Sequence, residues 1–292
     1  MSLSKRILRV TIQLPQGPVV LNDSLNLHVR ISKAALAIQN RAYIDVFNLS
    51  ASLRAQLLSQ FTLWHKRKVD NNQEKQDWVS VKVEAGYFID GQEQSSVVFT
   101  GEVAFCEPIS PPPNISVRLT CFTRQIDKTS FITSQSPTRT TFYEFVKWAA
   151  DEMGFGNNFE CQTSFNDKVV ENPAQGIYTR SALLIRIQDM YMPAVAAFVD
   201  DQKLIVKDIN KVINPSEVVT VKNFVGIPQW TEWGASFITL FDQSLKLAGG
   251  VRMESLMNPS LNDSTYVTTD MDYDLSSRDQ PFYVAVRCSP SA

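Results

Sequence analysis

Apolar and polar residues alternate along most of the two ends of this 292-residue chain. A β-strand points successive side chains to opposite faces of its sheet, so such alternation is typical of strands that are buried on one face. It covers residues 5–14, 25–34, 42–50, 78–88, 97–105 and 115–122, and beyond Pro215 it returns in 217–224, 235–241, 249–257, 265–275 and 282–289. The pattern predicts a mainly β protein of the α+β class.

Three strands near the C-terminus repeat the pattern of three strands near the N-terminus, in the same order. The segment VKVEA from residue 81 resembles VRMES from residue 251, at a shift of 170, and the next two strands match at shifts of 168 and 167. Any two alternating strands can be aligned by chance, but three in series favour a duplication. We therefore expect two similar β-barrel domains, with these matched pairs: Phe99–Val267, Val103–Met271, Phe105–Tyr273, Val117–Val284, Leu119–Val286 and Cys121–Cys288.

A smaller α/β region separates the two predicted barrels. Thr141 and Glu144 have the spacing of a capping box before an amphipathic helix that ends at Gly154, and Asp200 and Asp201 mark the turn of a hairpin within residues 194–209. Ser50 is placed to cap an earlier helix over 51–61. The expected domains are 1–125 for the first barrel, 126–215 for the middle domain and 216–292 for the second barrel.

Composition excludes several functional classes. The net charge of −2 gives no overall attraction to nucleic acid, and no apolar run is long enough to span a membrane. The four cysteines form no CxxC pair, and no phosphate-binding glycine motif is present. We expect a protein that is no enzyme and has no cofactor and no metal. Its cysteines should be reduced, as in a protein made in the cytosol, and Cys121 and Cys288 should lie in the core.

Few side chains suggest a chemical site. His28 is expected to point to solvent, and the aspartates 270, 272 and 274 to line one solvated face of a strand. The basic run His65, Lys66, Arg67 and Lys68 follows aromatic residues, a combination that can hold single-stranded nucleic acid. Cations are also favoured at the C-terminus of a helix, so we interpret this run as a helix end that enters a polar loop.

Four short motifs follow one another along the chain: Asn48-Leu49-Ser50 before a helix, Ala85-Gly86-Tyr87, Phe99 with Gly101, and Gly226 with Pro228. Together they resemble the baseplate hub proteins of contractile-tailed bacteriophages of the T4 type, which are related to the N-terminal part of type VI secretion spike proteins. The resemblance covers roughly residues 40–122 and 224–289 and departs from the family pattern at Asp242, Gln243 and Ala248, where relatives carry an Asn-Pro turn and a glycine.

The resemblance implies a structural virion protein of the tail baseplate. Three chains with two barrels each would form a homotrimeric, pseudo-sixfold ring that joins the tail tube protein to the central spike protein. The tape-measure protein and DNA would pass through its channel without specific binding, and baseplate wedge proteins are possible neighbours. The ring would have no membrane contact.

Three segments are candidates for the interface with partners. They are the loop that begins with His65, Lys66, Arg67 and Lys68, the proline segment with Pro112 and Asn114, and the pair Trp230 and Trp233, which could equally be core residues. Two other functions stay open: a nucleic-acid-binding barrel protein that uses the basic run, and a tail-associated cell-wall hydrolase.

Overall fold

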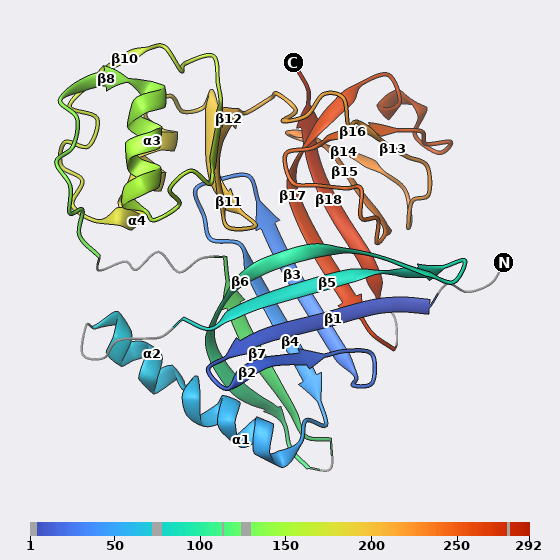
Figure 1. Cartoon of the computed structure of the whole chain (residues 1–292). Coiled ribbons are helices and arrows are strands. Elements are labelled where there is room, and N and C mark those ends of the chain that lie inside the picture. Colours follow the sequence, from blue (N-terminus) through green and yellow to red (C-terminus); the bar gives the residue numbers. More distant parts are fainter. Residues whose placement is uncertain (1–4, 72–77, 113, 124–129, 279–280) are drawn as a thin grey trace.

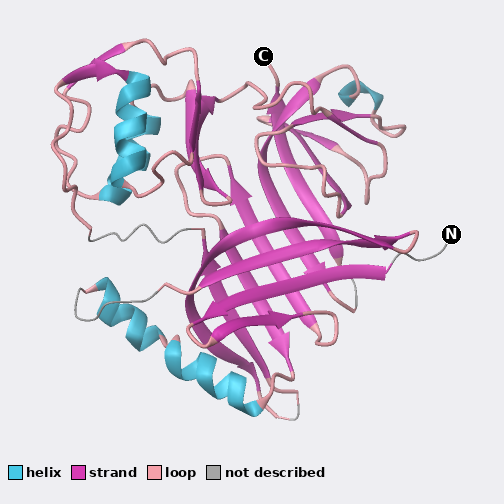
Figure 2. Cartoon of the chain, in the orientation of Figure 1, coloured by secondary structure: helices cyan, strands magenta, loops and turns pink. Residues whose placement is uncertain are grey.

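The computed structural model describes residues 5–71, 78–112, 114–123, 130–278 and 281–292. β-Strands are the main secondary structure and helices are few (Figure 2), which confirms the predicted fold class. The helices are α1 (Ala51–Gln60), α2 (Leu63–Asp70), α3 (Phe142–Glu152), α4 (Arg180–Asp189) and the short 3-10 helix η1 (Pro259–Leu261).

One large, strongly bent sheet contains the strands of both ends of the chain (Figure 1). Off its main path, β13 (Val219–Val221) pairs with β16 (Gly250–Met253), which pairs with β17. The main path runs, in spatial order, through β14 (Gln229–Thr231), β15 (Gly234–Leu240), β18 (Phe282–Pro290), β17 (Thr265–Ser276), β3 (Leu27–Ala34), β4 (Arg41–Phe47), β7 (Ser116–Phe122), β6 (Gln92–Ser110), β5 (Ser80–Ile89), β1 (Lys5–Leu14) and β2 (Gly17–Leu21).

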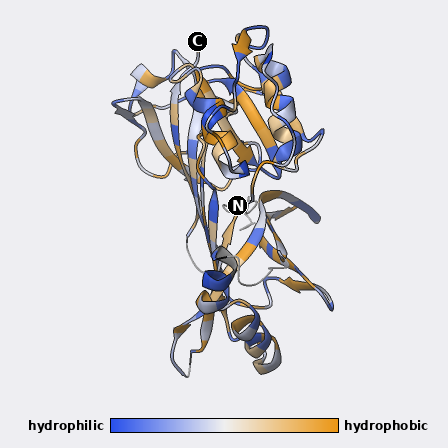
Figure 3. Ribbon diagram, turned by 90° about the vertical axis from the view of Figure 1, so that its left-hand side faces the viewer, coloured by the Kyte–Doolittle hydropathy of each residue, from blue (hydrophilic) through white to orange (hydrophobic). Residues whose placement is uncertain are grey.

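The alternation in the sequence places one side of this sheet in a hydrophobic core. In β3, for example, Leu27, Val29 and Ile31 are buried and the residues between them are partly exposed. Figure 3 shows the same alternation of hydrophobic and hydrophilic residues along the strands. The core is continuous between the two ends of the chain, since the ring of Tyr87 lies 5.4 Å from that of Phe282.

The strand pairing repeats between the two ends of the chain. The antiparallel set β4, β7, β6 and β5 has its counterpart in β15, β18, β17 and β16. Ala42 lies opposite Cys121, as Ala235 lies opposite Cys288, so the predicted equivalence of the two cysteines agrees with the register. Each set also contains a register irregularity at the same place, beside that cysteine.

The predicted alignment of the middle strand, β6 with β17, is wrong by three residues. Val103 lies opposite Cys121 and Thr268 lies opposite Cys288, so the counterpart of Val103 is Thr268 and not Met271. The pairing with β5 and β16 gives the same result, because Val81 opposite Gly101 matches Val251 opposite Tyr266 at the predicted shift of 170. At the irregularity beside Val103, and likewise beside Thr268, the strand contains an extra residue, so the residues after it point to the opposite face from the one that strict alternation predicts. An alignment based on alternation alone does not detect this extra residue.

The middle of the chain forms a separate hydrophobic core. Here β8 (Arg139–Thr141) pairs with β10 (Val169–Glu171), and a second small sheet has the order β11 (Val195–Asp200), β12 (Lys203–Asp208), β9 (Phe159–Gln162). The helix predicted after Thr141 is confirmed as α3, because the Thr141 hydroxyl accepts a hydrogen bond from the backbone N–H of Glu144 at 3.3 Å. The predicted apolar stripe of α3 is buried: Phe142, Phe145, Val146, Ala149 and Met153.

The predicted hairpin is formed by β11 and β12 and anchors the middle region to the large sheet. Its turn is made by Asp201 and Gln202, which both have positive φ. The ammonium of Lys33 in β3 lies 2.7 Å from a carboxylate oxygen of Asp200 and is only 5% exposed. Burial disfavours this charge, but the carboxylates of Asp200 and Asp201 outweigh burial and raise the pKa of Lys33.

Two glycines of the family motifs stand where chains approach closely. A Cβ on Gly86 would lie 2.0 Å from the backbone oxygen of Gln94, and one on Gly101 would lie 2.5 Å from that of Phe122. At the expected departure from the family pattern, Ala248 adopts a φ of 57°, a conformation that favours glycine. The main chain there is therefore the one that a glycine would adopt.

The helical segment after β4 differs in part from the prediction. Ser50 caps α1 by accepting a hydrogen bond from the N–H of Leu53 at 3.4 Å, as expected. The basic run does not follow the end of that helix but lies inside a second one, α2. The hydroxyl of Thr62 accepts a hydrogen bond from the N–H of His65 at 2.9 Å, so it caps a new helix that the sequence analysis missed.

Candidate assembly interface

The two tryptophans proposed for contacts with partners lie at one end of the large sheet. Trp230 is in β14, the terminal strand, and Trp233 is in the turn that connects β14 to β15. Trp230 is 50% exposed and Trp233 80% exposed, so neither is a core residue. The indole N–H of Trp230 donates to the hydroxyl of Ser260 at 2.9 Å, which fixes the position of that ring.

The basic run is part of an exposed helix surface. Trp64 of α2 is 63% exposed, and the charged groups of Arg67 and Lys68 lie 5.9 and 6.0 Å from the centre of its ring. These cations therefore cover the face of the aromatic ring that a nucleic acid base would need for stacking. The rest of the predicted loop, residues 72–77, lies outside the described residues.

Pro112 and Asn114 are both exposed and lie at the connection of β6 and β7. The three predicted segments lie in separate places: β14 at the upper right of Figure 1, α2 at the lower left and the β6–β7 connection at the bottom. The structure does not bring them together into one site.

One edge of β6 has no strand partner within the described part of the chain over part of its length, a feature that the sequence did not indicate. On its β5 side, β6 is paired as far as Glu102, which lies opposite Ser80. Beyond this point Val103 donates its N–H to the carbonyl of Val79 at 2.9 Å, and Cys106 donates its N–H to the carbonyl of Phe61 at 2.7 Å. No strand of the described residues pairs with this side of β6 between Val103 and Ser110.

The sheet face that is turned away from the core carries charges of both signs. On β17, Asp270 and Asp272 lie 3.3 and 3.7 Å from the guanidinium of Arg287, and Asp274 lies 2.5 Å from the imidazole of His28. The three aspartates share one face, as predicted. On β3, β4 and β7, the corresponding face holds a cluster of Arg30, Tyr43, Asp45 and Arg118, in which Asp45 accepts hydrogen bonds from Arg118 at 2.6 and 2.8 Å.

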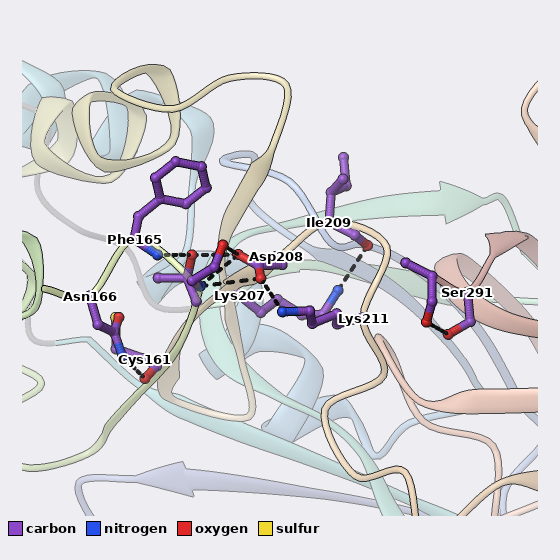
Figure 4. Close-up of polar contacts among 11 residues, drawn as sticks. Cys161, Phe165, Asn166, Lys207, Asp208, Ile209, Lys211 and Ser291 are labelled. Atoms are coloured by element: carbon purple, nitrogen blue, oxygen red, sulfur yellow. Dashed lines mark hydrogen bonds and ion pairs between the residues drawn. The ribbon is translucent and has the colours of Figure 1, made fainter. Parts of the chain in front are cut away.

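A buried polar cluster lies where the chain leaves β12 for the second set of strands (Figure 4). Asp208 accepts hydrogen bonds from the hydroxyl of Thr163 at 2.5 Å, the N–H of Ser164 at 3.1 Å and the ammonium of Lys211 at 2.7 Å. Its neighbour Lys207 is 2% exposed and donates to the carbonyl of Ile209 at 2.9 Å. Burial lowers the pKa of Lys207 to about 8, although Asp208 opposes this change.

The described residues contain no group of three or more His, Cys, Asp or Glu side chains that could hold a metal ion. Burial raises the pKa values of Cys106 and Cys288 to about 12 and that of Cys121 further, so these three thiols are far from the reactive thiolate form at neutral pH. None of the helices among the described residues is both long and apolar enough to cross a membrane.

Comparison with solved structures finds the same fold in phage tail proteins. A tail protein from Neisseria meningitidis MC58 has a TM-score of 0.60 at 9% identity, with 96% of each chain covered. The 43 kDa tail protein of prophage MuSo2 from Shewanella oneidensis has a TM-score of 0.57 at 10% identity, with 96% of this chain and 97% of that chain covered.

A third similar structure comes from a secretion machine. The Escherichia coli protein c3393, a component of the type VI secretion system with structural similarity to the T4 tail proteins gp27 and gp5, has a TM-score of 0.55 at 8% identity over 97% of this chain and 77% of that chain. No curated protein matches the sequence.

At the level of sequence, a family model described as "Baseplate hub gp41" matches residues 7–288, which is nearly the whole chain. The match agrees with the resemblance found in the short motifs and with the fold of the tail proteins. The chain belongs to the baseplate hub gp41 family.

Proposed function

We propose that three copies of this chain form a closed ring in the tail baseplate, where it joins the tail tube to the central spike. The observation that carries the proposal is the duplication within one sheet. Two equivalent sets of strands, each extended by one more strand (β3 beside β4, and β14 beside β15), lie side by side and meet where β17 pairs with β3. Three such chains in a ring would present six similar units, a geometry that fits a sixfold tube on one side and a threefold spike on the other.

The form of the junction supports a ring. The contact between β17 and β3 joins different edges of the two sets, so it is heterologous. A heterologous contact leaves one unused edge on each partner, and repetition of the contact generates either a closed ring or an open helix. Each chain already contains one such contact between its two sets of strands. The outer edge of each set, at β14 and at β6, has no strand partner among the described residues.

A channel through this ring would be lined by the charged face of the sheet. There arginines such as Arg30, Arg118 and Arg287 pair with the carboxylates of Asp45, Asp270 and Asp272. Binding of DNA through its phosphates requires cations that are free to replace counterions. A face of paired charges therefore suits the passage of DNA and of the tape-measure protein without retention.

The same ring would have further neighbours in the virion. One rim would contact the tail tube protein, and the opposite rim the spike protein. The outer surface, which includes the middle region and α2, is where baseplate wedge proteins would bind. Synthesis in the host cytoplasm would precede this assembly.

Mass measurement tests the ring directly. The chain should be found as a complex of three copies of 32.9 kDa, either alone or after mixing with tube and spike proteins, and electron micrographs should show a ring with a central hole. A tail whose hub contains any number of copies other than three would refute the proposal. Tight binding of DNA by the purified ring at physiological salt would contradict the role of the channel.

A further inference from the structure

The contact inside the chain predicts which strands meet between chains. Register identifies β14 as the counterpart of β3, because Trp230 lies opposite Ala235 as Ile31 lies opposite Ala42. The same comparison makes β6 the counterpart of β17. The counterpart of Asp272 is then Glu107, since Asp272 follows Thr268 by four residues as Glu107 follows Val103.

Within the chain, β3 and β17 are paired. Ser32 lies opposite Asp272, and its hydroxyl donates to the Asp272 carboxylate at 2.6 Å. Their counterparts, β14 and the stretch of β6 beyond Glu102, are not paired with each other. They are the unused edges of the two sets.

We propose that β14 of one chain pairs in antiparallel orientation with β6 of the next, in the register that β3 and β17 have within the chain. Thr231 would then lie opposite Glu107, Trp230 opposite Pro108, and Gln229 opposite Ile109. This inference rests on the proposed ring and adds to it the strands and the register of each interface between chains.

The length of β14 fits the space beside β6. Within the chain, β3 continues past Ser32 to Lys33 and Ala34, which lie opposite Met271 and Asp270. The counterpart of Met271 is Cys106, and there the carbonyl of Phe61 already occupies the edge of β6. Strand β14 ends at Thr231, the counterpart of Ser32, and turns away one residue before that position.

The backbone groups of the two edges allow a hydrogen bond in this register. Alternate residues of a strand direct their N–H and C=O groups to the same edge, so those of Pro108 point to the same side as those of Cys106. Proline has no N–H, and the N–H of Cys106 is bonded to Phe61, so this stretch of β6 offers carbonyl acceptors. The N–H of Trp230 would donate to the carbonyl of Pro108.

The exposed apolar side chains lie where this contact would cover them. All three residues of β14, which include Trp230, are exposed, and so is Trp233 in the turn that follows. The turn at Trp233 would face the start of α2, where Leu63 is 56% exposed and Trp64 63% exposed. Assembly would thus bury aromatic surface on both partners, as is typical of interface cores.

Cysteine pairs test the register in assembled tails. The variant Glu107→Cys/Thr231→Cys places two thiols at the positions whose counterparts, Asp272 and Ser32, touch within the chain. The matched control, Glu107→Cys/Gln229→Cys, displaces one thiol by two residues along the same face, to about 7–8 Å, which is beyond the reach of a disulfide. The single variants control for reaction with the native cysteines.

The expected result is covalent dimers and trimers on gels without reductant, at least about tenfold more abundant for the first pair than for the control pair. Mass measurement of the same tails shows whether the hub contains three chains. Three chains with no cross-link, or with preferential cross-linking of the control pair, would overturn the register and leave the ring intact. A hub without three chains would overturn both proposals.

Discussion

Lys207 allows a stringent test, because its burial predicts the direction and the size of a pH effect. The residue is 2% exposed, its ammonium donates a hydrogen bond to the carbonyl of Ile209, and burial lowers its pKa to about 8 from the ordinary 10.5. The unfolded chain therefore binds this proton more tightly than the folded chain. The resulting penalty is fully present below pH 8 and disappears as the pH rises from about 8 to 10.5.

The magnitude follows from the shift. At about 1.4 kcal/mol per pKa unit, the full penalty is about 3 kcal/mol, and between pH 7 and pH 10 about 2.5 kcal/mol of it should be relieved. The substitution Lys207→Met keeps a side chain of similar length and removes the titration. We expect the unfolding free energy of the natural protein, measured relative to this variant, to rise by about 2–3 kcal/mol between these two pH values.

Urea unfolding followed by tryptophan fluorescence at a series of pH values provides the measurement. All other lysines, tyrosines and cysteines titrate in both proteins, so their effects cancel in the difference. Lys147→Met is the matched control, because the side chain of Lys147 is 49% exposed. A difference between the natural protein and Lys207→Met that is independent of pH, or that falls with rising pH, would refute the argument.

Three further substitutions test the core and the junctions by urea unfolding. Met271→Asp should cost at least about 4 kcal/mol, because the side chain is fully buried, whereas Met271→Leu should cost less than about 1.5 kcal/mol; a soluble, stable Asp variant would contradict the burial. Gly86→Ala should cost about 1–3 kcal/mol, since its Cβ would meet the backbone oxygen of Gln94, and an unchanged midpoint would disprove this close approach. Lys33→Met should cost about 3–5 kcal/mol by leaving Asp200 without its partner, and the added change Asp200→Leu should recover part of the loss.

Local features of the fold could be predicted from the residues themselves. The alternation identified the strands, because a half-buried strand needs an apolar side chain at every second position. Thr141 indicated the start of α3, since a hydroxyl at this position satisfies a free N–H of the first turn. The resemblance to baseplate hub proteins was likewise carried by short motifs, two of which contain glycines at close approaches of the backbone.

Features that depend on register could not be predicted in this way. The alignment of β6 with β17 was wrong by three residues because both strands contain an irregularity, and an alternating pattern fits equally well at many offsets. The second helix, α2, was missed although Thr62 offered a capping signal. Whether Trp230 and Trp233 belong to the core or the surface was also left open by a pattern that treats all apolar side chains alike.

The sequence by itself determined that the chain is mainly β and that the strands of its two ends are related. These properties follow from side-chain periodicity, composition and spacing, which are local. Only the tertiary structure decided that both strand sets lie in one sheet, and that β14 and β6 remain as its unused edges. Strand pairing joins residues that are far apart in the chain through backbone groups that every residue except proline carries alike, so the sequence pattern holds almost no information about it.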